Sequence, residues 1–315
     1  MPAVPKHSLR YRGFGLTIEV PERVGRAIGR LRPKRPTPTE KLVLQAPPLV
    51  VVDSREHERA FMNDFVANAS GQLEVEASDS DEVAGHPWYH TIELPDGTVT
   101  PGRFDHRGLV PHYGLPDDLR GKRALDVGSG DGFWAFELER RGAEVTSLDI
   151  ETFADVDLPP ALHKIFVERP VDLSFRRGLE IARRRLGSPV KLINGPVYEL
   201  DPDEVGTFDL VHAGDILLHL RDPALALQRL RAVTSGQSLL ADCFDPVLDT
   251  LGAGPGLTRY RGGWHDVTWW APALSTLTQM VADAGFEDVQ VVTTYNLSER
   301  SGVRGLWRAV LRAQT

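Results

Sequence analysis

Residues 124–150 constrain the fold more than any other stretch of this 315-residue chain. Ala124, Leu125 and Val127 form a short apolar run suited to a buried parallel strand. Three alternate glycines within residues 128–132 then allow a turn that side chains would obstruct, and a helical pattern follows. A second apolar run ends at Asp149, 21 residues after the first of these glycines. The segment therefore predicts a strand, a turn, a helix and a strand, with a nucleotide site at the carboxyl edge of a parallel sheet.

Two features of this turn exclude the commonest nucleotide sites. The dinucleotide pattern G-x-G-x-x-G would place its third glycine at position 133, where the chain has Phe133. Asp126 lies just before the turn, where its carboxylate would repel a pyrophosphate but would suit a ligand with an ammonium group and no phosphate. The chain also has no G-x-x-x-x-G-K-[ST] motif, which excludes a P-loop.

The motif Asp-Val-Gly-Ser-Gly-Asp-Gly at residues 126–132, together with Asp149, resembles the class I S-adenosylmethionine (SAM) methyltransferases. The resemblance implies that Asp126 faces the methionine amino group of SAM and that Asp149 holds the ribose hydroxyls. It also implies a Rossmann-like α/β fold, with a doubly wound, mostly parallel sheet of seven strands and an N-terminal appendage.

The rest of the chain fits that fold, because strand and helix patterns keep alternating after Asp149. We expect strands at residues 190–193, 208–213, 238–244, 289–294 and 305–311. We expect helices at residues 170–187, 222–233 and 271–284, with further helices at 21–31 and 56–69. Residues 86–94 are predicted to be extended and to run into a turn at Pro95-Asp96-Gly97.

A narrower resemblance rests on residues 88–97 (WYHTIELPDG), 131–137 (DGFWAFE) and 206–223 (GTFDLVHAGDILLHLRDP). These segments are similar to the tRNA wobble-uridine carboxymethyltransferase family and its uncharacterised relatives. Members that use carboxy-SAM grip its extra carboxylate with a lysine, a tyrosine and an arginine.

This chain departs from that grip, since the tyrosine position is Leu218 and no lysine lies between Lys41 and Lys122. Arg304 could match the arginine member of the grip. One cation beside an apolar Leu218 is a poor clamp for a carboxylate. We therefore expect SAM itself, rather than carboxy-SAM, as the cofactor.

The cofactor site that the resemblance implies consists of residues at or near the ends of predicted strands. Val197 and Tyr198 are expected near the adenine, and Ala213 and Gly214 along the methionine. The full predicted set is Asp126, Gly128, Ser129, Gly130, Asp149, Ile150, Val197, Tyr198, Ala213 and Gly214.

The reaction needs little from the protein beyond placing a nucleophile in line with an activated methyl group. A general base would help a hydroxyl or amine acceptor, and His90, Asp215 and His219 are the candidates. Each histidine could instead be hydrogen-bonded in a lid or core, and Asp215 could cap a helix. The predicted acceptor-binding residues are Trp88, Tyr89, Arg103, Trp264, Trp269 and Trp270. The tryptophans could equally form a hydrophobic cluster beneath a long loop.

Charge is distributed unevenly along the chain. Residues 1–41 carry a balance of +7, which leaves −15 for the remaining 274 residues, given the total of −8. We interpret residues 1–47 as a basic arm with a proline-rich linker, residues 48–120 as a lid and residues 121–315 as the methyltransferase core. The arm could dock on the body or touch tRNA.

Composition adds a few limits. The lone cysteine, Cys243, excludes an internal disulfide, and no metal-binding motif is expected. No run of eighteen apolar residues occurs, so we expect a cytoplasmic protein without a membrane partner. The sequence favours methyl transfer to a small-molecule acceptor. The alternatives are a tRNA wobble-uridine modifying enzyme and a SAM-binding protein without turnover. The oligomeric state stays open.

Overall fold

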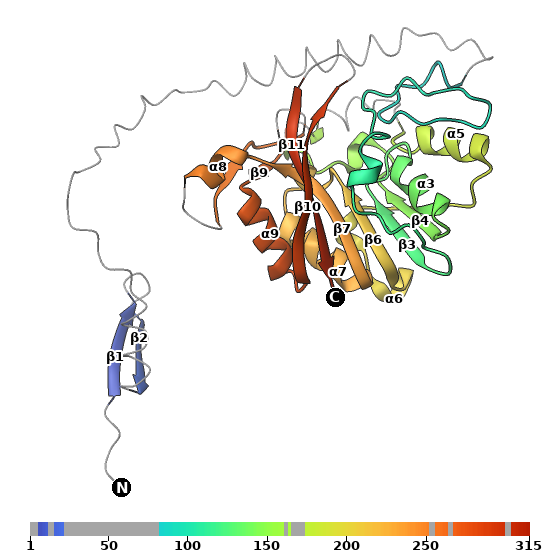
Figure 1. Cartoon of the computed structure of the whole chain (residues 1–315). Coiled ribbons are helices and arrows are strands. Elements are labelled where there is room, and N and C mark those ends of the chain that lie inside the picture. Colours follow the sequence, from blue (N-terminus) through green and yellow to red (C-terminus); the bar gives the residue numbers. More distant parts are fainter. Residues whose placement is uncertain are drawn as a thin grey trace, which may run out of the picture. The chain divides into compact units, whose positions relative to one another are not determined.

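The computed structural model describes residues 6–11, 16–21, 82–160, 163–164, 174–251, 256–263, 267–299 and 304–315 (Figure 1). The chain divides into two units, Met1–Val52 and Asp53–Thr315. In the first unit, β1 (Lys6–Tyr11) and β2 (Leu16–Pro21) form an antiparallel hairpin, with Leu9 opposite Ile18. This hairpin is not among the elements predicted from the sequence, and the helices expected at 21–31 and 56–69 lie outside the described residues.

The second unit is built around a seven-stranded sheet in the order β10-β11-β7-β6-β3-β4-β5. Neighbouring strands among β3–β7 run parallel, whereas β11 pairs antiparallel with both β7 and β10. The strands are β3 (Arg123–Val127), β4 (Glu144–Asp149), β5 (Lys191–Asn194), β6 (Phe208–Gly214), β7 (Thr234–Phe244), β10 (Glu287–Ser298) and β11 (Arg304–Gln314). The predicted doubly wound sheet with a final antiparallel pair is confirmed.

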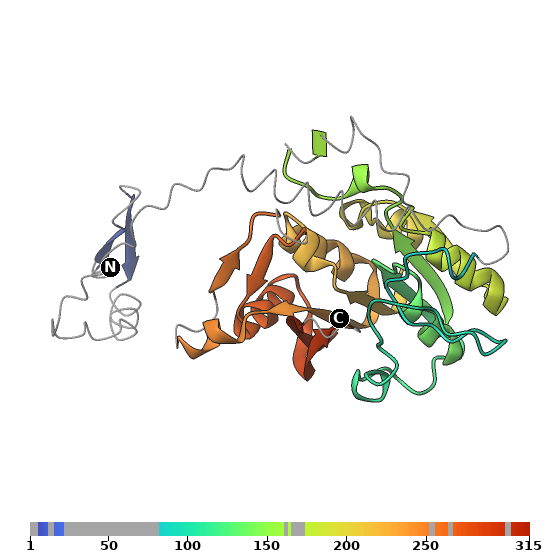
Figure 2. The ribbon, with the colours of Figure 1, turned by 90° about the horizontal axis from the view of Figure 1, so that it is seen from above.

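Helices cover both faces of this sheet, as the two views show (Figures 1 and 2). Consecutive strand residues point to opposite faces, so Leu239 joins a core with α3 and α5 while Leu240 joins a second core with α7 and α9. The α-helices are α3 (Phe133–Arg140), α5 (Arg177–Leu186), α6 (Pro202–Val205), α7 (Pro223–Val233), α8 (Pro246–Thr250) and α9 (Leu274–Asp283). Short 3₁₀ turns are η1 (Val110–His112), η2 (Phe153–Asp155), η3 (Val197–Glu199) and η4 (Leu217–His219).

Local chemistry explains where these helices begin and end. The carboxylate of Asp222 accepts the backbone N–H of Leu225 at 2.9 Å and so caps α7, with Pro223 at its first position. The helix expected at 271–284 is shorter, because β9 (Trp270–Pro272) pairs with β8 (Thr258–Tyr260) before α9 begins. Tertiary pairing thus overrides the helical pattern at the start of that segment.

A cap of irregular, mostly extended chain precedes β3. Residues 86–94 are extended as predicted, with isolated bridges from His90 to Phe104 and from Glu93 to Val99. The turn after Leu94 is closed by a hydrogen bond in which the backbone N–H of Leu94 donates to the carbonyl of Thr98 at 2.8 Å. This cap packs on the α3 side of the sheet, since Trp88 and Ile92 share the core cluster of Leu138.

Candidate active site

The turn between β3 and α3 is built as its glycines predict. Gly128 and Gly130 have φ angles of +71° and +53°, a left-handed region that side chains disfavour. Ser129 closes the turn, because its hydroxyl donates to the carbonyl of Asp126 at 2.9 Å and accepts the hydroxyl of Ser147 at 2.7 Å. These hydrogen bonds hold the turn in place.

Asp149 lies beside this turn, at the end of the neighbouring strand. Its two carboxylate oxygens accept the N–H of Gly130 at 2.7 Å and the N–H of Ile150 at 2.8 Å. Burial raises the pKa of Asp149 to about 6, although the two backbone donors lower it. Each oxygen keeps a lone pair, so the carboxylate can accept two further donors such as the hydroxyls of a ribose.

Asp126 has one engaged and one open oxygen. Its Oδ1 lies 2.6 Å from Nδ1 of His212, and both side chains are only 1% exposed. Its Oδ2 is buried and has no hydrogen-bond partner. Because a buried carboxylate oxygen needs a donor, an incoming ammonium group fits this position.

The remaining predicted cofactor residues lie along the same edge of the sheet. Ala213 is the neighbour of Val127 across the β3–β6 pair, and Gly214 follows it. A Cβ on Gly214 would lie 3.0 Å from the His212 ring, so the close approach requires glycine. Val197 in η3 is buried, and the chain just before it is tied to β4 through the N–H of Gly195, which donates to the carbonyl of Asp149 at 3.1 Å.

The Tyr198 side chain points toward Asp157 and the start of α7. Its hydroxyl donates to Asp157 at 2.8 Å and accepts the N–H of Asp222 at 3.0 Å, at the start of α7. The ring packs against the core on the α7 face. Tyr198 thus anchors the loop that would flank an adenine.

The cap is pinned to the glycine turn by Asp131. This carboxylate accepts the N–H of Tyr89 at 2.6 Å and the N–H of His90 at 2.8 Å, and it lies 3.3 Å from Nε2 of His86. His90 therefore sits directly on the turn, where a Cβ on Gly130 would lie 3.4 Å from its ring. The predicted coverage of the cofactor site by this segment thus has a specific anchor.

His90 is buried and stacks on Phe133 with ring centroids 5.9 Å apart. Its Nδ1 has no hydrogen-bond partner. Burial lowers the pKa of His90, against the neighbouring Asp131, which raises it. The imidazole is therefore neutral near pH 7 and able to accept a proton, as a base must.

A second group of side chains gathers at the end of β6, next to Gly214. Asp215 has a left-handed φ of +52° and its carboxylate accepts Nε of Arg308 on β11. Arg308 is 7% exposed and its Nη1 is buried without a partner. Burial, together with the charge of Asp215, raises the pKa of both Tyr89 and Tyr295. We call Tyr89, Asp215, Tyr295 and Arg308 the mouth cluster.

His212, Tyr295 and Arg308 are not among the site residues predicted from the sequence. Arg304, the arginine that could match the carboxylate grip, begins β11, but the structure does not describe its side chain. Arg308 is four residues further along the same strand and therefore on the same face. Strand periodicity after Arg304 was the available signal for it.

The other predicted residues are spread over the structure. Arg103 pairs with Glu299 and lies over the Phe104 ring, with its Cζ 5.3 Å from the ring centroid. His219 is half-buried, with Nδ1 3.1 Å from the carbonyl of Val267. Trp88 belongs to the core, where its indole N–H donates to Val83 at 2.7 Å.

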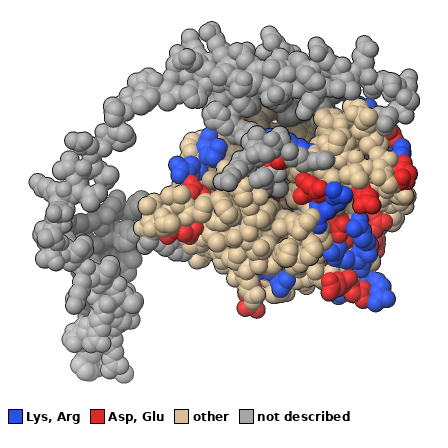
Figure 3. All heavy atoms as spheres, turned by 45° about the horizontal axis from the view of Figure 1, so that its top comes forward, with Lys and Arg blue, Asp and Glu red and all other residues tan. Residues whose placement is uncertain are grey.

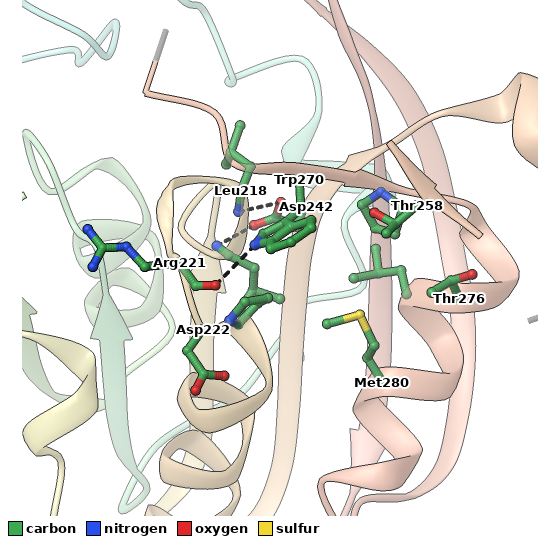
Figure 4. A pocket seen from close by; sticks show the side chains of 12 residues that line it. Leu218, Arg221, Asp222, Asp242, Thr258, Trp270, Thr276 and Met280 are labelled. Atoms are coloured by element: carbon green, nitrogen blue, oxygen red, sulfur yellow. Dashed lines mark hydrogen bonds between the residues drawn. The ribbon is translucent and has the colours of Figure 1, made fainter. Parts of the chain in front are cut away.

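The tryptophan-rich segment is only partly described, because Trp264 lies outside the described residues. Trp269 is buried and its indole N–H donates to Asp157 at 2.6 Å. Trp270 donates to the carbonyl of Arg221 at 3.2 Å and covers a cavity of about 300 Å³ (Figure 4). These contacts show a packed cluster, with one ring left facing a cavity.

That cavity lies between α7, α9 and the β9 strand, and it contains no residue of the glycine turn. Its lining includes Leu217, Leu218, Asp242, Trp270, Leu277 and Met280. Asp242 accepts the N–H of Leu217 at 2.7 Å and the N–H of Leu218 at 3.1 Å, and so holds η4 in place. Burial, aided by Asp215, raises the pKa of Asp242 to about 7. The cavity therefore lies beside the carboxyl end of β7 and is not lined by the glycine turn.

The doubly wound sheet, the glycine turn and the two aspartates at its carboxyl edge define a class I SAM-dependent methyltransferase. The chain belongs to the methyltransferase domain family, which it matches over residues 108–291. S-adenosyl-L-methionine is therefore its cofactor, and the open Oδ2 of Asp126 and the lone pairs of Asp149 fit that molecule.

Individual relatives agree with this class. The chain is 25% identical over 235 residues to the tRNA U34 carboxymethyltransferase of Citrifermentans bemidjiense. The aligned region covers 72% of the chain and 64% of that protein. It is 32% identical over 127 residues to the magnesium-protoporphyrin O-methyltransferase of Rhodobacter capsulatus. That alignment covers 40% of the chain and 46% of the relative. The chain thus spans roughly half to two thirds of the length of these curated relatives.

Among solved structures, the chain is similar to the 1,6-didemethyltoxoflavin-N1-methyltransferase of Burkholderia thailandensis, bound to 1,6-didemethyltoxoflavin and S-adenosylhomocysteine (SAH). The identity is 18%, the TM-score is 0.44, and the match covers 88% of this chain and 98% of that one. Within the described residues, no helix is both long enough and apolar enough to cross a membrane.

Proposed function

We propose that the chain transfers the methyl group of SAM to a small-molecule acceptor by in-line displacement, and that the acceptor is held at the mouth cluster. The observation that carries this proposal is Arg308. The Arg308 residue is only 7% exposed, and its Nε donates to Asp215, the residue after Gly214. Its Nη1 is buried and has no hydrogen-bond partner. Such a group needs an oxygen acceptor, and a carboxylate or phenolate on the substrate would supply one.

Bound SAM supplies a methyl group on a sulfonium, which departs as a neutral thioether when a lone pair of the acceptor forms its bond to the methyl carbon. The protein orients both molecules and takes up the proton that the acceptor releases. Neutral His90 is the proposed base, because Asp215 is engaged with Arg308 and His219 with the Val267 carbonyl.

Asp215 itself supports a functional role for this mouth. A residue other than glycine with a φ of +52° is strained by about 1–3 kcal/mol, and such strain gathers at functional sites. The ion pair with Arg308 holds Asp215 in this conformation.

The second candidate function is carboxymethyl transfer to a tRNA wobble uridine. It is supported by the similarity to tRNA U34 carboxymethyltransferases and by Arg308, which would also suit a carboxylate on the transferred group. Against it, Leu218 is buried in an apolar cluster with Cys243 and Ala271. On the face shown in Figure 3, basic and acidic side chains are also interspersed rather than gathered into one basic tract.

Native mass spectrometry of the purified chain tests the cofactor first. Co-purified SAM or SAH supports methyl transfer, whereas a carboxylated adduct would favour the tRNA function. Incubation with methyl-labelled SAM and either a metabolite extract or a tRNA fraction then separates the acceptors. Label in tRNA, with binding that weakens steeply with salt, would contradict the small-molecule proposal.

Substitution of Arg308 tests the mouth once a labelled product is found. We expect Arg308→Gln to lower kcat/KM for the acceptor by about tenfold or more while SAH binding persists. Arg312→Gln is the matched control, because Arg312 lies on the same strand and donates to the carbonyl of Gly114 at 3.1 Å. Equal effects of the two substitutions would contradict a role for Arg308 in holding the acceptor.

A further inference from the structure

A buried chain of three side chains leads from the cap to the cofactor edge of the sheet. Nδ1 of His212 lies 2.6 Å from Oδ1 of Asp126, and Nε2 of His212 lies 2.8 Å from the hydroxyl oxygen of Tyr113. All three side chains are at most 1% exposed. The arrangement follows from the β3–β6 register, which places Asp126 beside His212, and from Tyr113, which ends η1.

The protons in this chain are fixed by its geometry. Burial holds the pKa of Tyr113 well above its usual value, so the phenol keeps its O–H and can donate to Nε2 of His212. The opposite tautomer would leave a bare Nδ1 facing a carboxylate oxygen at 2.6 Å, which repels. Nδ1–H of His212 therefore donates to Oδ1 of Asp126.

We call Tyr113, His212 and Asp126 the relay. The side chains around the relay exclude solvent from it and hold it in one orientation. The ring of Trp134 stacks on Tyr113 at a centroid distance of 3.9 Å and lies 5.2 Å from the ring of His212. Gly214 leaves the space that the His212 ring occupies, since a Cβ there would be 3.0 Å from it. With Oδ1 fixed in this way, Oδ2 of Asp126 is the one carboxylate oxygen left open.

We propose that Tyr113 and His212 are positioning residues that hold the carboxylate of Asp126 in one orientation and aim its Oδ2 at the methionine ammonium of the cofactor. The inference rests on the cofactor site of the proposed function and adds two residues that the motif does not contain. The relay acts on the ammonium alone, so it distinguishes ligands that carry this group from ligands that lack it.

Two amide substitutions at His212 test the relay. The amide nitrogen of asparagine can replace Nδ1 and keep the donor to Asp126, whereas glutamine reaches only the Nε2 position beside Tyr113. We expect His212→Gln to weaken SAH binding by about tenfold, and His212→Asn to stay within about threefold of the wild type. Isothermal titration calorimetry measures both, with thermal melting to confirm that the variants fold.

The comparison ligand is 5′-methylthioadenosine, which keeps the adenosine and thioether but has no ammonium. Its affinity is expected to change less than about twofold in either variant. An equal loss for both ligands, or equal behaviour of the two variants, would overturn the relay as a positioning device. A wild-type chain that binds neither ligand would instead refute the proposed cofactor site.

Tyr113→Phe provides a second route if His212→Gln does not fold. It removes the hydroxyl that fixes the His212 tautomer and leaves the aromatic ring against Trp134. We expect SAH binding to weaken by about threefold, with 5′-methylthioadenosine unaffected. Unchanged SAH binding by a folded Tyr113→Phe protein would remove Tyr113 from the relay.

Discussion

Lowering the pH from 7 to 5 should weaken cofactor binding through Asp149. Its pKa is raised to about 6 by burial, so with ordinary titration about nine tenths of Asp149 is ionised at pH 7 and about one tenth at pH 5. Each oxygen already accepts a backbone N–H, and a proton would occupy a lone pair that the ribose hydroxyls need. We therefore expect the affinity for SAH to fall about tenfold over this range, which is about 1.4 kcal/mol.

The direction of each pH effect depends on which protonation form of Asp149 is favoured by folding and which by cofactor binding. A carboxyl whose pKa rises on folding favours the protonated form, so the ligand-free protein loses stability as the pH rises from about 4 to 6. Cofactor binding favours the ionised form and opposes this loss. The increase in melting temperature on adding SAH should therefore be larger at pH 7 than at pH 5.

The assay is isothermal titration calorimetry with SAH at several pH values between 5 and 7. The ligand's α-amino group stays protonated throughout this pH range. Asp149→Asn is the control, because the amide does not titrate and its binding should be weak and nearly independent of pH. A flat affinity in the wild type would refute the assignment. The same slope in Asp149→Asn would refute it too and would point to another group such as Asp242, whose pKa is raised to about 7.

Three further changes test other parts of the structure. Gly178→Ala should lower the free energy of unfolding by about 1–3 kcal/mol, because the new Cβ would lie 2.0 Å from Oδ1 of Asp131. Gly108→Ala is the control and should leave that free energy unchanged, because the space around Gly108 is open. Denaturant titrations measure both. His90→Ala should reduce methyl transfer by about 100-fold while the affinity for SAH stays nearly the same; full activity would dismiss His90 as the base. Deletion of residues 1–41 should leave SAH binding unchanged by calorimetry, and loss of folding would show that this segment supports the second unit.

The fold was predictable because its signals are local. The glycine turn, the apolar runs and the capping residues of α7 each lie within a few positions of one another. Asp126 and Asp149 follow from the same stretch, since one lies just before the turn and the other ends the next strand. The helix predicted at 271–284 was wrong at its start, where β9 pairs with β8 and α9 begins only at Leu274.

The partners of these aspartates were not predictable, because they come from distant parts of the chain. His212 reaches Asp126 only through the adjacency of β3 and β6, and Tyr113 only through the fold of the cap. Arg308 meets Asp215 because the final strand inserts between β7 and β10. Apart from the strand periodicity that links Arg308 to Arg304, nothing in the local pattern around these residues distinguishes them from ordinary core or surface positions. The local pattern thus predicted the two carboxylates of the proposed cofactor site, whereas their partners follow from strand order.

The charges at the carboxyl edge explain why this arrangement suits a cationic cofactor. Asp126, Asp149, Asp215 and Asp242 lie at or near the ends of four neighbouring strands, and burial raises the pKa of two of them, Asp149 and Asp242. Arg308 neutralises Asp215, which leaves the opposite side of the edge acidic. SAM carries a sulfonium and an ammonium, and positive charge at that acidic side offsets the repulsion among the carboxylates. Methyl transfer removes the sulfonium charge, so this part of the electrostatic stabilisation is absent from the SAH complex.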